Sequence, residues 1–176
     1  MRRRDKKMHL IIDGYNLLHV AHPLMHFNSI QLQWERDRLV DQLSDYQKVK
    51  PCGITVVFDG WQGGWSTEKR EKKKGIELVF SKLGEKADEV IKRLVKERGS
   101  EAIVITSDRD IARFAERLRV SVISSEQFQE KLERSSAESH EFLAGGEEEE
   151  KGAKIKGLSR RPSKKEKRVR AALKKL

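Results

Sequence analysis

Short runs of apolar, mostly β-branched residues recur in the part of the chain before residue 125. Residues 9–13, 53–59 and 102–108 each end at an aspartate, and residues 75–81 and 120–124 each end at a serine. Runs that are apolar throughout and bounded by Gly, Asp or Ser are typical of strands buried on both faces, as in parallel sheets. The pattern therefore predicts five strands of a mainly parallel sheet.

Segments with helical periodicity lie between these runs, in residues 31–49, 86–98 and 109–119. Ser107 and Asp110 have the spacing of a capping box, which predicts that the third helix begins there. Strands that alternate with helices form α/β sheets with right-handed crossovers. The apolar positions that share a helical face are Leu32, Leu39, Leu43 and Tyr46, then Ala87, Val90, Ile91, Leu94 and Val95, then Ile111, Ala112, Ala115 and Leu118.

The charge is concentrated at the two ends of this 176-residue chain. Of the net charge of +10, residues 1–7 carry +4, residues 8–128 carry +1, residues 129–150 carry −6 and residues 151–176 carry +11. A nearly neutral body with basic arms is typical of proteins that bind nucleic acid. RNA is therefore one of the partners we consider.

The pattern changes again after about residue 135. The stretch that follows is acidic, contains glycine and has no apolar period, which predicts a flexible linker. Near the end, Ser163 and Glu166 have capping-box spacing, and Val169, Ala172, Leu173 and Leu176 share one face of a short basic helix. We expect a basic extension at 1–7, one domain at 8–134, an acidic flexible linker at 135–153 and a flexible basic tail with this amphipathic helix at 154–176.

Several classes of protein are excluded. The single cysteine, Cys52, forms no intramolecular disulfide and rules out a cysteine-based zinc site. No apolar run has the length of a membrane span or of a signal-peptide core, so we expect a cytoplasmic protein with no membrane contact. His19, His22 and His26 match no common closed zinc site, and a polar surface loop is the preferred interpretation.

Aspartates follow several of the predicted strands. Asp13, Asp59 and Asp108 each end one, and Asp88 lies at the start of the helix after the strand predicted at 75–81. The carboxyl ends of parallel strands share one edge of a sheet, so these side chains should converge there. A single aspartate after a strand is often only a helix cap, and Asp110 is interpreted in that way.

Carboxylates gathered at one edge repel one another unless a cation neutralises them. Oxygen ligands select Mg²⁺ or Mn²⁺, ions that activate water and stabilise the charge of a phosphoryl transition state. Hydrolysis of phosphodiester bonds is the reaction that this arrangement suits best.

A series of motifs in this order resembles the YacP-like branch of the NYN-domain family, which belongs to the PIN-like metal-dependent ribonucleases. The resemblance covers roughly residues 8–130 and implies a PIN-like three-layer α/β/α sandwich. It also implies cleavage of RNA with Mg²⁺ or Mn²⁺, in a branch associated with ribosome-linked mRNA endonucleases. The motifs are LIIDGYNLL (10–18), VVFDG (56–60), ELVFS (77–81), GEKADEVI (84–91) and IVITSDRDI (103–111).

Carried over motif by motif, the acidic pocket would consist of Asp13, Asn16, Asp88 and Asp108, with Asp59 beside it. Asp13, Asp88 and Asp108 would hold the metal. Asn16 can ligate a metal through its carbonyl oxygen or hold a phosphate through its amide, and a turn residue is an equally good interpretation. Ser107 is a candidate for contact with phosphate or with a metal-bound water, although a helix cap needs no such role.

Residues 60–75 are predicted to form a mobile basic loop that contacts RNA. Tryptophans stack on bases and basic side chains meet phosphates, although the alternative is one packed tryptophan and solvated lysines. Arg36 is interpreted first as part of a solvated helix face, with phosphate contact as the alternative. The RNA-binding candidates are Trp61, Trp65, Lys69, Arg70, Lys72, Lys73 and Lys74, together with Arg36.

The sequence thus favours a metal-dependent endoribonuclease whose substrate is RNA, in particular mRNA, with the ribosome as a further candidate partner. The main alternative is a non-catalytic RNA- or ribosome-binding adaptor on the same fold. A dehalogenase-type phosphatase needs an acid where Tyr15 stands, and a Toprim-like site expects Glu at the position of Asp13. No Rossmann or P-loop glycine pattern occurs, so we expect no nucleotide cofactor. For the basic tail, RNA or ribosome docking is preferred over a membrane or a partner groove.

Overall fold

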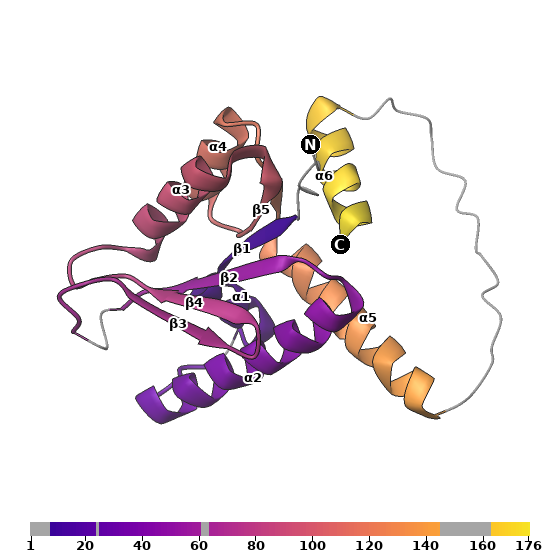
Figure 1. Cartoon of the computed structure of the whole chain (residues 1–176), viewed down its shortest axis with the longest axis horizontal. Helices are drawn as coiled ribbons and strands as arrows, with labels where there is room; N and C mark the ends of the chain where they lie inside the picture. Colours follow the sequence, from indigo (N-terminus) through magenta and orange to yellow (C-terminus); the bar gives the residue numbers. More distant parts are fainter. Residues whose placement is uncertain (1–7, 24, 61–63, 145–162) are drawn as a thin grey trace, which may run out of the picture.

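A six-stranded sheet forms the centre of the computed structural model, which describes residues 8–23, 25–60, 64–144 and 163–176 (Figure 1). The strand order is β3-β4-β2-β1-β5-β6, and all neighbours are parallel except β3 and β4. The five predicted strands are present. The strands are β1 (His9–Asp13), β2 (Gly53–Phe58), β3 (Lys69–Lys73), β4 (Ile76–Phe80), β5 (Ala102–Ile105) and β6 (Ser121–Ile123).

Helices cover both faces of the sheet, giving three layers (Figure 1). One face packs against α1 (Gly14–Ala21), α2 (Ser29–Val49) and α5 (Ser125–Ala144). The other packs against α3 (Ala87–Arg98) and α4 (Arg109–Arg117). A single 3₁₀ turn, η1 (Gly99–Glu101), joins α3 to β5, and α6 (Lys164–Lys175) lies near the C-terminus.

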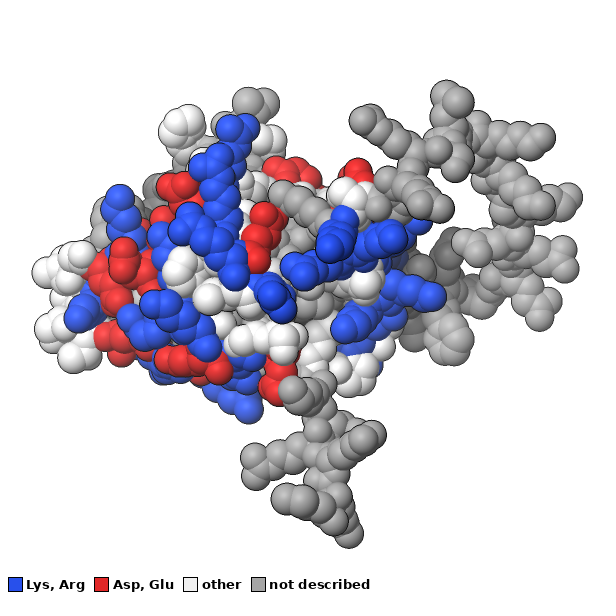
Figure 2. All heavy atoms as spheres, turned by 90° about the horizontal axis from the view of Figure 1, so that it is seen from above, with Lys and Arg blue, Asp and Glu red and all other residues white. Residues whose placement is uncertain are grey.

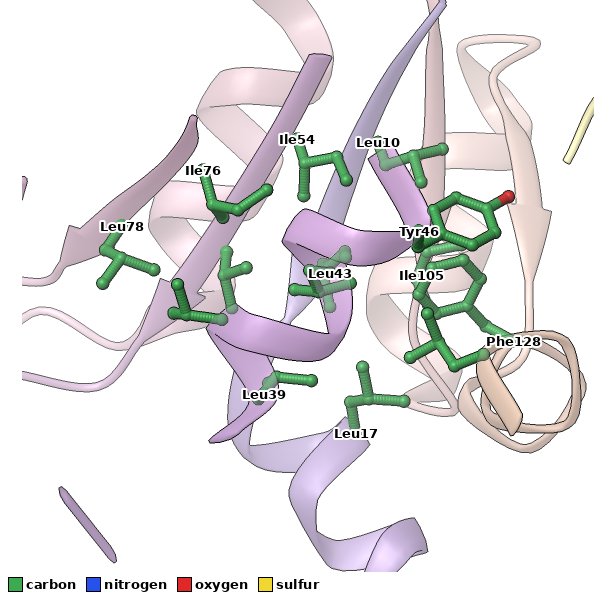
Figure 3. Close-up of a cluster of buried hydrophobic side chains, with 14 of the residues drawn as sticks. Leu10, Leu17, Leu39, Leu43, Tyr46, Ile54, Ile76, Leu78, Ile105 and Phe128 are labelled. Carbon is green, nitrogen blue, oxygen red and sulfur yellow. The ribbon is translucent and has the colours of Figure 1, made fainter. Parts of the chain in front are cut away.

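Two apolar cores hold these layers together because successive side chains of a strand point to opposite faces. In β1, Leu10 and Ile12 belong to one core and Ile11 to the other, and all three are fully buried. Burying one such side chain away from water stabilises the folded state by about 1.5–3 kcal/mol. Figure 3 shows the larger core, in which strand residues Leu10, Ile54, Ile76, Leu78 and Ile105 lie with Leu17, Leu39, Leu43, Tyr46 and Phe128 from the helices.

Residues 69–73 form an edge strand, and the prediction of a loop through 60–75 is wrong for this part. β3 pairs antiparallel with β4, with Lys69 opposite Phe80 and Lys73 opposite Ile76. The connecting turn has positive φ at Lys74 (51°) and Gly75 (86°), which fits the twist of a tight hairpin. The strand lacks apolar alternation because it lies at the edge, where charged side chains prevent pairing with other chains.

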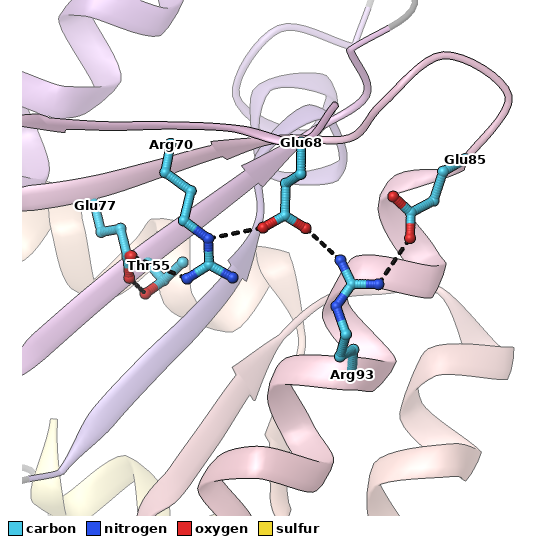
Figure 4. Close-up of polar contacts among 6 residues, drawn as sticks. All are labelled: Thr55, Glu68, Arg70, Glu77, Glu85 and Arg93. Atoms are coloured by element: carbon cyan, nitrogen blue, oxygen red, sulfur yellow. Dashed lines mark hydrogen bonds and ion pairs between the residues drawn. The ribbon is translucent and has the colours of Figure 1, made fainter. Parts of the chain in front are cut away.

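A chain of alternating charges ties the β3–β4 hairpin to α3 (Figure 4). Arg93 of α3 pairs with Glu68, just before β3, and with Glu85, just before α3. These contacts hold the start of α3, which carries Asp88. In order, the chain runs through Glu85, Arg93, Glu68, Arg70, Glu77 and Thr55.

The C-terminal part departs from the expected linker and free tail. Residues 135–144, expected to be irregular, continue α5 as helix. In α6, Ser163 and Glu166 form the capping box, and Ala172 and Leu176 are only 3% and 4% exposed. The Tyr46 hydroxyl donates to the Leu176 carbonyl oxygen at 2.9 Å. The apolar face of α6 therefore packs on the protein's own body.

No helix within the described ranges combines the length and the apolar character that a membrane span requires.

Candidate active site

Three of the predicted acidic residues lie at the carboxyl-terminal edge of the sheet. Asp13 is the last residue of β1, Asp88 is the second residue of α3, and Asp108 precedes α4. All three are half-buried. The charges of Asp88 and Asp108 both act on the Asp13 carboxyl, so the strand order brings these three groups together.

Asp13 is the centre of this acidic pocket. Its Oδ1 accepts from the Asn16 backbone N–H at 3.2 Å, and its Oδ2 accepts from the Thr106 hydroxyl at 3.2 Å. Burial, with smaller contributions from Asp88 and Asp108, raises the pKa of Asp13 to about 6 despite these hydrogen bonds. The ionised form of Asp13 is therefore disfavoured unless a positive charge, such as a bound cation, lies beside it.

Asn16 links three elements of the site. Its Oδ1 accepts from the Ser107 backbone N–H at 3.0 Å and from the Ser125 hydroxyl, at the start of α5, at 2.7 Å. Because two donors already occupy this oxygen, the amide group of Asn16 is the part suited to hold a phosphate oxygen.

The helix cap expected at Ser107 is made by Asp108 instead. The Asp108 Oδ1 accepts from the backbone N–H groups of Asp110 at 2.7 Å and Ile111 at 3.0 Å. The Ser107 hydroxyl donates to Glu126 at 2.6 Å, a contact that lowers the pKa of Glu126. Asp108 thus both begins α4 and contributes charge to the pocket.

Asp59 stands on the β2–β4 side of this edge. Its Oδ1 accepts from the Ser81 hydroxyl at 3.1 Å, and Ser81 in turn accepts from the Gly60 N–H at 3.0 Å. A Cβ on Gly60 would lie 1.8 Å from the Ser81 carbonyl oxygen, so only glycine fits. The charge of Asp59 acts on Tyr15, which places Asp59 toward that ring.

Comparison with known proteins identifies the family. The model of the YacP-like NYN domain matches residues 10–172. The chain belongs to this family. The match extends the resemblance, expected over residues 8–130, as far as α6. The family is a nuclease-type family with a PIN-like fold, and the three-layer architecture confirms the expected fold.

Relatives of this NYN domain come from Bacillus subtilis. The uncharacterized protein YacP of strain 168 is 30% identical over 87 residues, which make up 49% of this chain and 51% of that protein. The chain thus matches about half the length of this relative. A crystal structure of Rae1 (YacP), a tryptophan-to-leucine mutant, has a TM-score of 0.65 at 21% identity and covers 78% of this chain and 82% of its own. A second Rae1 (YacP) structure has a TM-score of 0.61 at 24% identity, covering 77% and 79%.

The donor chemistry of the NYN pocket fits a hard divalent cation. Its acids are carboxylates, and Mg²⁺ typically keeps several waters while binding one or two of them. Within the described ranges, no three His, Cys, Asp or Glu side chains are grouped closely enough to hold one ion between them. The side chains are thus of the kind that such an ion binds, without forming a closed three-ligand site among the described residues.

Of the two tryptophans predicted to bind RNA, the structure describes only Trp65. Trp61 lies outside the described residues. Trp65 is half-buried, with its ring centroid 5.3 Å from that of Phe80, and the Lys69 ammonium lies 4.7 Å from the Trp65 ring centroid. Trp65 therefore packs back on the body, as the alternative interpretation expected.

Most basic candidates on the hairpin have acidic partners inside the domain. Lys73 pairs with Asp37 at 2.7 Å and Lys74 with Asp41 at 2.6 Å. These pairs connect the hairpin to α2. Similarly, Lys69 pairs with Glu71, Arg70 pairs with Glu68 and Glu77, and Lys72 is exposed.

Arg36 is half-buried, although a solvated helix face was the preferred interpretation. Its guanidinium lies 5.8 Å from the Phe58 ring centroid and 5.7 Å from that of Phe80, and its Nε donates to the Leu32 carbonyl at 3.3 Å. Nearby, the buried Tyr15 hydroxyl has no hydrogen-bond partner among the described residues. The Arg36 guanidinium and the Tyr15 hydroxyl are thus polar groups among the aromatic rings near Asp59.

Four residues of the site were missed at the level of sequence. Thr106 holds Asp13, Ser125 holds Asn16, Ser81 holds Asp59 and Glu126 accepts from Ser107. Thr106 and Ser81 lie within the family motifs that contain or precede the aspartates, and this position in the motifs is a sequence signal by which they could have been found. Ser125 and Glu126 carry no such signal because α5 reaches the site only through tertiary packing.

Proposed function

We propose that this chain is a metal-dependent endoribonuclease that hydrolyses RNA phosphodiester bonds. The observation that carries the proposal is that Asp13, Asp88 and Asp108 lie together at the carboxyl-terminal edge of the sheet, where partial burial and the two neighbouring carboxylates raise the pKa of Asp13 to about 6. Carboxylates gathered in this way, with one of perturbed pKa, are typical of a cation site. Membership of a nuclease-type family supports hydrolysis as the reaction.

Each residue of the pocket has a role in this proposal. Asp13, Asp88 and Asp108 hold Mg²⁺ or Mn²⁺ directly or through its waters. When bound, the ion supplies an activated water and stabilises the charge that develops on the phosphate. Asn16 holds a phosphate oxygen through its amide, and Asp59 and Ser107 line the approach to the pocket. No side-chain nucleophile is needed.

The substrate class is RNA, and mRNA is the form that the family resemblance favours. Basic segments at both ends of the chain support a polyanionic partner. The ribosome belongs to the same proposal, because the resemblance is to a branch associated with ribosome-linked mRNA endonucleases. The setting is cytoplasmic, with neither a membrane nor a nucleotide cofactor involved.

A non-catalytic RNA-binding adaptor is the second candidate. It is favoured by one observation: the described acids form no group of three that could share an ion. An adaptor binds RNA equally well in EDTA, and Asp→Asn changes leave its affinity for RNA unchanged.

The deciding experiment measures cleavage of an end-labelled single-stranded RNA with Mg²⁺, Mn²⁺ or EDTA. We expect cleavage only with an ion, and a loss of at least about 100-fold in Asp13→Asn, which removes the central ligand charge. Asp45→Asn, the same chemical change at an exposed position of α2, should cleave like the parent. RNA binding without cleavage under every condition, on free RNA and on translating ribosomes, would establish the adaptor instead.

A further inference from the structure

A second strongly charged surface lies on α6, away from the acidic pocket. The segment 164–175 contains seven Lys or Arg and one Glu, and that Glu166 is already engaged in the capping box. Figure 2 shows Lys and Arg side chains gathered over this helix. We define the α6 basic face as the exposed side chains of Lys164, Lys167, Arg168, Arg170, Lys174 and Lys175.

The charges of the α6 basic face are available to a partner. Within the part of the chain that the structure describes, none of its six side chains forms an ion pair. By contrast, Lys73 and Lys74 of the hairpin pair with aspartates of α2. The α6 basic face therefore differs from the other basic segment, whose charges largely serve the fold.

The fold fixes this face in one position. Ala172 and Leu176 are buried, and the Tyr46 hydroxyl binds the Leu176 carbonyl oxygen. Lys167, Arg170 and Lys174 lie on the opposite side of the helix, because their spacing of three and four residues returns to one face. A rigid helix presents these charges without the entropy cost of ordering a tail.

The α6 basic face and the acidic pocket lie at opposite ends of the parallel strands. Arg168, Ala172 and Lys175 line a pocket of about 270 Å³ together with Met8, just before β1, and with Ala102 and Ser121, the first residues of β5 and β6. The acidic pocket lies beyond the other ends of these strands. Since a five-residue strand is roughly 17 Å long, an RNA of a few nucleotides in the pocket does not reach α6.

The chemistry of α6 favours double-helical RNA. No aromatic residue occurs in residues 163–176, so the helix offers no platform on which unpaired bases could stack. Lys and Arg suit the phosphate backbone, through which proteins recognise RNA duplexes by shape. Insertion into a membrane needs an exposed apolar face, and that of α6 is buried against the body.

We propose that the α6 basic face is an anchoring site for the phosphate backbone of double-helical RNA, while the acidic pocket cuts a separate single-stranded segment. This deepens the proposed function and rests on it for the choice of RNA as the polyanion. The enzyme then selects single strands that lie near a duplex, as in a folded RNA or an RNA assembly.

The test compares two triple variants that remove the same charge. Lys167→Gln, Arg170→Gln and Lys174→Gln remove three of the six charges of the α6 basic face. Arg113→Gln, Arg117→Gln and Arg134→Gln neutralise exposed arginines of α4 and α5 as the control. Binding to a fluorescent RNA hairpin with a 20-base-pair stem is measured with both triples in the Asp13→Asn background, which separates binding from cleavage.

We expect the α6 triple to weaken hairpin binding by about tenfold or more near 0.1 M salt and to reduce the slope of log K against log salt by about 2–3. The control triple should change affinity by less than about twofold. With Asp13 intact, the α6 triple should cleave a five-nucleotide RNA at the parental rate. Circular dichroism of both triples checks that they are folded.

Three results would overturn the anchoring site: parental affinity in the α6 triple, equal losses in both triples, or no hairpin binding by the parent at 0.1 M salt. The face would be assigned to membranes instead if the parent bound phosphatidylserine vesicles but not the hairpin, and if the α6 triple, but not the control triple, lost this vesicle binding. Failure of the parent to cleave any RNA, with hairpin binding still dependent on α6, would reject the nuclease and leave the anchoring site standing.

Discussion

At the scale of single residues, the same side chain often serves the fold and the candidate site. Asp13 and Asp108 each cap the helix that follows them, and each contributes to the acidic pocket. A cap needs only an oxygen acceptor, whereas a cation site needs the negative charge. Amide and alanine replacements therefore separate the two roles.

Asp108 gives the clearest separation. Asp108→Asn keeps an oxygen that accepts from the backbone N–H groups of Asp110 and Ile111. Its free energy of unfolding should therefore lie within about 0.5 kcal/mol of the parent's, but RNA cleavage should be lost. Asp108→Ala removes the acceptor as well and should lower the free energy of unfolding by about 1 kcal/mol more. Urea titration and the cleavage assay check both variants, and parental cleavage by Asp108→Asn would remove this residue from the site.

At the scale of elements, the β3–β4 hairpin illustrates a structure held mainly by backbone pairing and by the conformation of its turn. Its strand β3 is entirely charged, and its turn places Lys74 and Gly75 at positive φ. The ion pairs with α2 are exposed, so each contributes little to stability. The conformation of the turn should therefore decide how firmly the hairpin is paired.

Gly75→Ala tests this. A side chain at φ +86° costs about 1–2 kcal/mol, so we expect that loss in the free energy of unfolding, with faster amide exchange along β3. Lys74→Gly, at the neighbouring turn position, removes a similar strain from the folded state but makes the unfolded chain more flexible. Because these two effects oppose each other, its free energy of unfolding should stay within about 0.5 kcal/mol of the parent's. If Gly75→Ala were as stable as the parent, the turn geometry would need revision.

At the scale of the whole molecule, opposite pKa shifts occur at the two ends of β1. Burial, with a smaller effect of Arg98, lowers the pKa of His9 to about 4, while burial and neighbouring acids raise the pKa of Asp13 to about 6. His9 contributes stability that is complete above pH 6.5 and is lost as pH falls toward 4. Asp13 contributes stability that is complete below about pH 3.8 and is lost as pH rises through 6.

These two contributions oppose each other in the same pH window, so each should emerge when the other residue is replaced. In EDTA, as pH falls from 6 to 4, the free energy of unfolding of Asp13→Asn should decrease relative to that of the parent, because the variant lacks the contribution of Asp13 at low pH. Over the same range the free energy of unfolding of His9→Gln should increase relative to that of the parent. Each change should be on the order of 2 kcal/mol. Urea titrations at pH 4, 5, 6 and 7 measure both trends. Parallel pH profiles of parent and variants would show that neither pKa is shifted.

The sequence by itself determined the five apolar strands, the helices between them and the edge at which Asp13, Asp88 and Asp108 meet. These features were readable because they depend on local periodicity and on the shared direction of parallel strands. The family followed from the same motifs, which stand around those aspartates.

Only the tertiary structure decided where charged or irregular segments go. Strand β3 pairs through its backbone with β4, residues 135–144 continue α5, and α6 packs its small apolar face on Tyr46 and the sheet. Ser125 reaches Asn16 across 109 positions of the chain. Each of these outcomes depends on partners distant in sequence, and local composition carries no information about the surface that such a partner offers.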